Sequence, residues 1–179
     1  MPLIDSYIKF DAIPGSYTTS TSATMLKHEI NHTGWSEIYS LKYDLDGSVY
    51  PTLTITKPVD RASNSIYSLY LKNRARKLKP SNKSDPKVKE IIVHLCQWID
   101  GQTQFWVFLE FIFTNCRVLD YSTKMDCDAD DFPEETIEFG FREMSMGYYY
   151  IKRDEAEKRI GDDHSGIDWN FATMEGDTY

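Results

Sequence analysis

Residues 136–150, TIEFGFREMSMGYYY, decide the fold, because their apolar periodicity breaks once and then resumes. From Ile137 to Phe141 every second residue is apolar, so these side chains share one face of a strand. The apolar set then steps three residues to Met144, which would move the following side chains to the opposite face. An extra residue near Arg142, a β-bulge, keeps both sets on one core. A long bent strand that carries aromatic residues favours a closed or nearly closed β-barrel.

Composition sets the class of protein. The chain has 179 residues, which predicts one domain spanning 1–179, and its twelve Tyr, nine Phe and four Trp favour β structure. A net charge of −8 argues against a nucleic-acid-binding module. No apolar run approaches the roughly 18–20 residues of a membrane span. The N-terminus lacks the layout of a signal peptide, and three cysteines have no paired spacing, so we expect synthesis in the cytoplasm with free thiols.

The rest of the pattern predicts mostly strands and one confident helix. Ser63 is an expected N-cap for a helix over Asn64–Arg76, where apolar residues recur at helical spacing. Ala23–Ile30 is expected to form a helical turn or two, and Arg153–Gly166 a charged linker. Alternation and turn signals predict strands over 6–13, 35–45, 50–56, 89–98, 104–117 and 167–174, with a turn at Asp46-Gly47 and an acidic loop over 120–135.

Motifs that carry catalytic or metal chemistry are lacking in the sequence. The aspartate spacing that begins at Asp126 resembles the opening of a calcium loop, but Asp131 and Ile137 stand where glycine and glutamate are required. His94 and Cys96 face the same way on a strand, yet no further ligands lie near them in sequence, which favours a packed core pair over a metal site. Neither a nucleophile–base pattern nor a glycine-rich phosphate loop is found. We therefore expect no enzyme activity, no cofactor and no metal.

Opposite charges gather in two segments. Eight basic side chains lie between residues 72 and 89, and eight acids lie between residues 120 and 138. One interpretation is two solvated loops. The other is a head-to-tail contact between copies of the chain, which closes into a ring or continues as a filament. The residues expected at that subunit interface are Arg74, Arg76 and Lys77 on the basic side and Asp128, Asp130 and Asp131 on the acidic side.

Four segments, in order along nearly the whole chain, resemble the hemolysin-coregulated protein family, the tube subunit of bacterial type VI secretion systems. They are SYIKFDAIPG near the N-terminus, LTITKPVDRASNSIYSLYL, ETIEFGFREMSMGYYYI and GIDWNFATMEG near the C-terminus. The second segment holds a connector with the pattern Lys-x-x-Asp-x-x-Ser, at Lys57, Asp60 and Ser63. The third carries the parity shift described above.

This resemblance implies a mostly β fold, a compact β-barrel of two packed sheets with one flanking α-helix. It implies homohexameric rings that stack into a tube inside a contractile sheath, below a spike trimer. Sheath contraction would expel the tube into the medium or a target cell, without a signal peptide and without insertion into a membrane. It also implies that effector proteins travel in the lumen of the ring.

Two departures from the family pattern stand out. Residues 16–33 form an insertion between the first two strands, and the long glycine-rich loop used in ring stacking is reduced to Asp46-Gly47-Ser48. Two alternatives stay open: a tube subunit of another contractile particle, such as a phage tail, and a monomeric secreted β-barrel that binds a ligand or is itself an effector.

Overall fold

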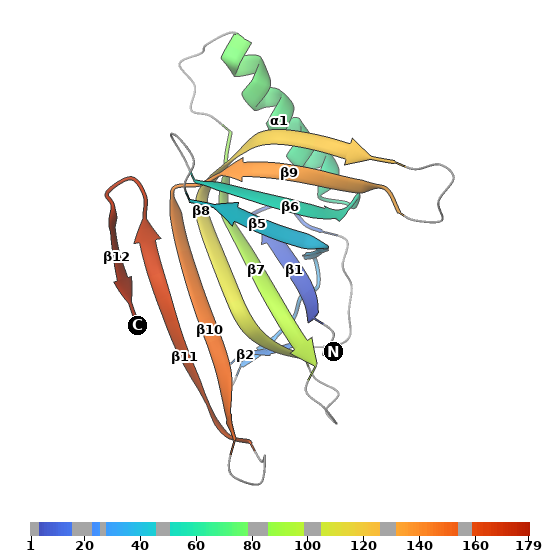
Figure 1. Ribbon diagram of the computed structural model, residues 1–179. Coiled ribbons are helices and arrows are strands. Elements are labelled where there is room, and N and C mark those ends of the chain that lie inside the picture. The colour runs from blue at the N-terminus through green and yellow to red at the C-terminus, as the bar shows by residue number, and fades with distance from the viewer. Residues whose placement is uncertain are drawn as a thin grey trace.

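The computed structural model describes residues 4–15, 23–25, 28–45, 51–78, 86–98, 105–125, 132–153 and 159–179. Within them the chain forms mostly antiparallel sheets with one helix (Figure 1). The elements are β1 (Ile4–Phe10), β2 (Ala23–Met25), β3 (His28–Ile30), β4 (Ser36–Glu37), β5 (Ser40–Asp44), β6 (Thr52–Pro58), α1 (Ser63–Leu78), β7 (Val88–Trp98), β8 (Phe105–Lys124), β9 (Glu134–Gly140), β10 (Glu143–Arg153), β11 (Arg159–Asn170) and β12 (Glu175–Thr178).

Strand β8 belongs to both sheets. Its first half pairs with β7 and β10 in sheet A, and its second half pairs with β9 in sheet B. Between the halves Asn115 adopts a left-handed backbone with φ 56°, a conformation that Asn tolerates better than most residues. The register also shifts between Val118 and Asp120. These two irregularities bend β8, so the second half crosses to the upper sheet in Figure 1.

The predicted bulged strand over 136–150 is two strands. β9 ends at Gly140 in sheet B, and β10 begins at Glu143 in sheet A, so the chain changes sheets where a bulge was expected. The parity inference is confirmed, because Phe139, Phe141 and Met144 enter one buried cluster and Met146 packs against it. Tyr148 follows them by alternation but is 47% exposed, beyond the edge of that core.

The predicted strand over 35–45 also divides between the sheets. β4 pairs with β1 in sheet A, whereas β5 pairs with β6 in sheet B. The helical turns expected over Ala23–Ile30 are wrong, because β2 and β3 pair as antiparallel strands and β2 also pairs in parallel with the start of β8. The turn at Asp46-Gly47 lies outside the described residues.

The charged linker expected at Arg153–Gly166 is wrong in its second half. β11 already begins at Arg159 and pairs with β10, and the additional strand β12 pairs with the end of β11. The acidic loop expected over 120–135 is shorter, since β8 continues to Lys124 and β9 begins at Glu134. Charged and polar residues interrupt the apolar alternation in these segments, so periodicity alone does not indicate the strands.

Two buried clusters lie on opposite faces of sheet A. The larger fills the space between the sheets and includes Phe10, Phe113 and Phe139. The predicted helix is α1, which packs on β8 with Ile66 in that cluster. The smaller cluster consists of Tyr7, Trp35, Cys96 and Val107. Among the described residues, no helix has the length and apolar character needed to cross a membrane.

Candidate functional site

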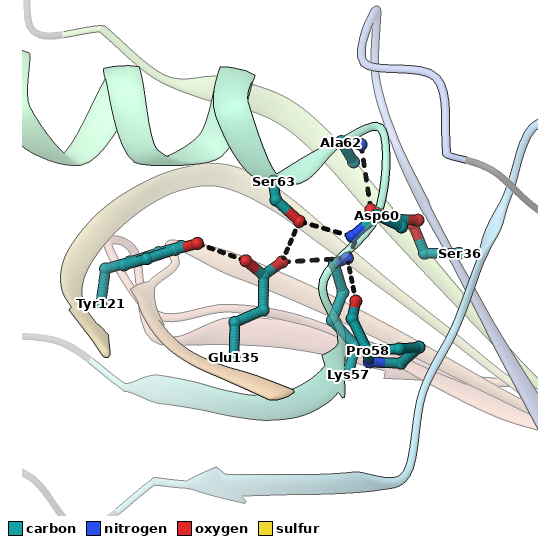
Figure 2. A network of polar contacts seen from close by, with 8 residues as sticks. All are labelled: Ser36, Lys57, Pro58, Asp60, Ala62, Ser63, Tyr121 and Glu135. Atoms are coloured by element: carbon teal, nitrogen blue, oxygen red, sulfur yellow. Dashed lines mark hydrogen bonds and ion pairs between the residues drawn. The ribbon is translucent and has the colours of Figure 1, made fainter. Parts of the chain in front are cut away.

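A buried charged network lies where β6 runs into α1. Figure 2 shows the Lys57 ammonium group directed at two carboxylates, 2.5 Å from Asp60 Oδ1 and 2.9 Å from Glu135 Oε1. Lys57 also donates to the Pro58 carbonyl at 2.9 Å. Both Lys57 and Glu135 are fully buried. Because a buried charge is stable only when it is paired and hydrogen-bonded, these groups depend on one another.

The start of α1 belongs to the same network. Ser63 begins the helix, but its expected role as a side-chain N-cap is wrong, since its hydroxyl accepts the Asp60 backbone N–H at 2.8 Å and donates to Glu135 at 2.9 Å. The capping carboxylate is that of Asp60, which accepts the Ala62 N–H at 2.9 Å and the Ser36 hydroxyl at 2.6 Å. Burial alone would raise the pKa of Asp60, but its hydrogen bonds from Lys57 and Ser36 outweigh burial and hold the pKa below its ordinary value.

Tyr121 closes the far side of the network. Its hydroxyl donates a short hydrogen bond to Glu135 Oε2, and burial together with this carboxylate raises the pKa of Tyr121 to about 12. The network thereby joins β4, β6, β8, β9 and α1. With Lys57 and Glu135 closed off from solvent, it cannot reach a substrate, and its chemistry is that of a structural junction.

Sequence reasoning located half of this junction. The connector pattern named Lys57, Asp60 and Ser63, and the structure brings all three together. The prediction from the sequence placed Glu135 among the eight acids of an exposed segment. This is wrong, because Glu135 is buried. The signal was available, since Glu135 shares the parity of the core residue Ile137 in β9.

A second polar chain crosses the other face of sheet A. His32 Nε2 lies 2.9 Å from His94 Nδ1, His94 Nε2 lies 2.7 Å from Glu110 Oε2, and the Tyr149 hydroxyl donates to Glu110 Oε1 at 3.0 Å. Burial, with a smaller contribution from His94, lowers the pKa of His32 to about 3. Burial alone would raise the pKa of Glu110, but hydrogen bonds and charge from His94 hold it below its ordinary value.

The structure supports the interpretation of His94 and Cys96 as core residues. Both are buried, and Cys96 packs with Trp35 in the smaller cluster. Burial raises the pKa of the Cys96 thiol to about 12, which keeps it protonated. Within the described part of the chain, no three His, Cys, Asp or Glu side chains come close enough to hold a metal ion.

Of the six residues expected at a subunit interface, the structure describes the three basic ones. Arg74 and Lys77 are exposed on α1, and Arg76 is half-buried. Arg74 donates to the Tyr70 hydroxyl at 3.1 Å. The partners expected for them, Asp128, Asp130 and Asp131, lie outside the described residues. The contact between the two segments therefore stays a prediction.

Solved structures similar to this chain include proteins of type VI secretion. Hcp1 from Salmonella typhimurium matches with a TM-score of 0.67 at 17% identity, covering 99% of this chain and 100% of its own. A structure described as a type six secretion system protein matches with a TM-score of 0.68 at 20% identity, covering 98% and 100%. A type VI secretion system effector from Yersinia pestis gives 0.59 at 18% identity, covering 90% and 98%.

No family model matches the chain, and no curated protein matches it either. At these identities the structural matches establish the fold. They confirm the expected barrel-like arrangement of two sheets with a flanking helix.

Proposed function

We propose that this chain, as a single domain over residues 1–179, is a tube subunit of the hemolysin-coregulated protein family in a type VI secretion system. It forms homohexameric rings that stack end to end. The observation that carries the proposal is the match to Hcp1 over 99% of this chain and 100% of that one. Such coverage leaves no part of Hcp1 without a counterpart in this fold.

The sheet edges support assembly with further copies. Among the described strands, β5 pairs only with β6 and β12 only with β11, so each has one unpaired edge. Tyr39, Tyr43 and Leu45, on and beside β5, are 54%, 37% and 47% exposed. Unpaired edges and exposed apolar side chains are liabilities in a monomer, and ring closure would cover them.

The other partners follow from the same proposal. A contractile sheath surrounds the tube, a spike trimer caps it, and effector proteins occupy its lumen. The subunit is made in the cytoplasm and leaves the cell when the sheath contracts. The protein has no catalytic role, which is supported by the closed Lys57 network and by the secretion proteins that share its fold.

Native mass spectrometry of the purified chain at micromolar concentration tests the ring. We expect a species of six subunits, with ring-shaped particles in electron micrographs. Tyr39→Lys, at the exposed residue directly before β5, should shift the population towards monomer. The matched control is Val59→Lys, which changes an exposed apolar residue of the connector before α1. A monomer at every concentration would contradict the proposal.

The second candidate is a monomeric secreted effector, which the match to the Yersinia pestis protein favours. The same measurement separates the two, since an effector of this kind has no need of a ring. A third possibility, a tube subunit of a phage-tail-like particle, shares the ring. Neighbouring genes for a sheath, a baseplate and an ATPase would distinguish it.

A further inference from the structure

A hollow of about 250 Å³ opens on β8, β10, β11 and β12. Two rows of paired residues run across these four strands and surround it. One row is Thr114, Glu143, Asn170 and Glu175, and the other is Ile112, Ser145, Asp168 and Asp177. Met144, Trp169 and Gly176 lie between the rows and complete its lining.

The hollow is strongly acidic. Four of its lining residues are carboxylates, and none is Lys or Arg. Asp168 and Asp177 are exposed and directly opposed across β11 and β12, a like-charge pair that destabilises the sheet when nothing neutralises it. Glu143 is half-buried and held by the neutral donors Thr114 at 2.6 Å and Asn170 at 2.9 Å. The site is therefore built for a cation that comes from outside this face.

The exposed side of α1 has the opposite character. The helix carries four basic residues and no acid. Tyr67 and Leu71 are 44% and 46% exposed, and Arg74 follows at the spacing that places all three on one stripe. The inner side of α1 packs on β8, where Asn73 donates to the Val118 carbonyl at 3.2 Å. Tyr67 also lies against Tyr121 of β8, with ring centroids 5.0 Å apart, so one end of the stripe borders its own sheet. Leu71 and Arg74 continue it along the exposed side of α1 and give it a cationic end.

We infer that the stripe of Tyr67, Leu71 and Arg74, with Lys77 beside it, docks into the acidic hollow of a second copy of the chain. Arg74 enters between Asp168 and Asp177, and Lys77 lies at the acidic rim. The contact joins two different surfaces and is therefore head to tail, as rings and stacks require. This inference rests on the proposed self-assembly. It assigns the basic helix to the acidic hollow as its binding surface, in place of the acidic segment 120–138.

Charge reversal with rescue tests this contact on the full chain. Arg74→Glu with Lys77→Glu should raise the concentration for half-assembly at least about tenfold at low salt, measured by analytical ultracentrifugation. Asp168→Lys with Asp177→Lys should do the same, and combining both pairs should restore assembly. The matched controls, Lys87→Glu with Lys89→Glu and Asp11→Lys with Glu37→Lys, alter exposed charges elsewhere and should have little effect.

The outcomes separate this contact from the proposed function. If the wild type forms rings and both reversed variants form them equally well, the contact is overturned, whereas the proposed function as a tube subunit is not. Rescue of the helix reversal by Asp128→Lys, Asp130→Lys and Asp131→Lys, but not by the sheet reversal, places the helix on the acidic segment and overturns the hollow as acceptor. A monomeric wild type overturns the assembly and the contact together. Should a reversal unfold the chain, Asp168→Asn with Asp177→Asn should still weaken assembly, and unchanged assembly in that variant overturns the contact.

Discussion

Two regions of this molecule each hold a glutamate beside a basic side chain, but the base differs between them. In each, a glutamate lies between a basic side chain and a tyrosine hydroxyl: Lys57, Glu135 and Tyr121 beneath α1, and His94, Glu110 and Tyr149 on sheet A. The Glu135 side chain is completely buried, whereas that of Glu110 is 15% exposed. The first base is an ammonium group, and the second is an imidazole in a chain where burial lowers the pKa of His32 to about 3.

This difference separates a fixed junction from a titratable one. The lysine network joins β4, β6, β8, β9 and α1 and holds the two sheets to the helix. The histidine chain reaches His32, which belongs to the inserted segment 16–33 and lies against Tyr7 with ring centroids 4.6 Å apart. We therefore expect changes in the lysine network to affect global stability, and changes in the histidine chain to affect how stability depends on pH.

The largest effect should come from Lys57→Met. The variant leaves Glu135 buried without its cation and removes the ion-pair contact from Lys57 to Asp60. Breaking a buried pair in this way typically costs about 3–5 kcal/mol, so the free energy of unfolding in urea should fall by that amount or the chain should fail to fold.

A paired replacement supplies the control for that result. Lys57→Met combined with Glu135→Leu removes both charges and should recover a large part of the loss, because apolar side chains of similar size can replace a buried ion pair. A loss below about 1 kcal/mol in Lys57→Met alone would show that the network does not hold the junction.

The lysine junction was also the more predictable of the two. Lys57, Asp60 and Ser63 are three apart, so a sequence pattern can name them. Its fourth member, Glu135, comes from a strand 72 residues after Ser63 and is recognisable only by its parity with Ile137. The histidine chain gave no such signal, because His32 and His94 are 62 residues apart and meet only in the folded protein.

The positions of several strands were predictable from the sequence, whereas the points at which the chain changes sheets were not. Alternation located β1, β6, β7 and β8, since each keeps one side toward a core. Alternation predicted β4 and β5 as one strand, and β9 and β10 as one strand. The reason is that a chain that changes sheets can keep its apolar parity. Side-chain periodicity reports which face is buried and contains no information on which strand is the hydrogen-bond partner.

The second effect is a loss of stability in acid that depends on His32. Its pKa is lowered from the ordinary 6.5 to about 3, so below pH 6.5 the unfolded chain binds a proton that the folded chain does not. Stability therefore falls with decreasing pH, by about 1.4 kcal/mol per pH unit from this group between roughly pH 6 and 4. Asp60 and Glu110, whose pKa values are also lowered, add to the loss below about pH 4.

His32→Phe tests that slope directly. Phenylalanine keeps a ring against Tyr7 but cannot titrate, so the dependence of unfolding free energy on pH should flatten between pH 6 and 4, even if the variant is less stable at pH 7. His164→Phe is the matched control, because it replaces an exposed histidine outside the buried chain. Equal slopes in wild type and His32→Phe would remove His32 as the source.

A smaller effect is expected for Tyr121→Phe. The variant removes one donor from the fully buried Glu135 and leaves Lys57 and Ser63 in place. An unsatisfied buried acceptor costs about 1–3 kcal/mol, measurable by urea unfolding at pH 7. The raised pKa of Tyr121 makes the wild type lose stability as pH rises from 10 to about 12, and this alkaline loss should shrink in the variant.

The smallest effect is expected for Tyr149→Phe, the equivalent change in the histidine chain. Glu110 keeps its hydrogen bond to His94, and its partly exposed carboxylate can reach water in place of the lost hydroxyl. The cost at pH 7 should therefore be about 0.5–1 kcal/mol, near the net value of a replaceable hydrogen bond and below that for Tyr121→Phe. The Tyr149 hydrogen bond also helps to hold the pKa of Glu110 down, so its loss should move the acid unfolding limb to higher pH. Urea unfolding of both variants at pH 7 measures the order, and unfolding followed down to about pH 3 measures the shift. A larger loss in Tyr149→Phe than in Tyr121→Phe would mean that Glu110 is as closed to water as Glu135, and the distinction between a fixed and a titratable junction would fail.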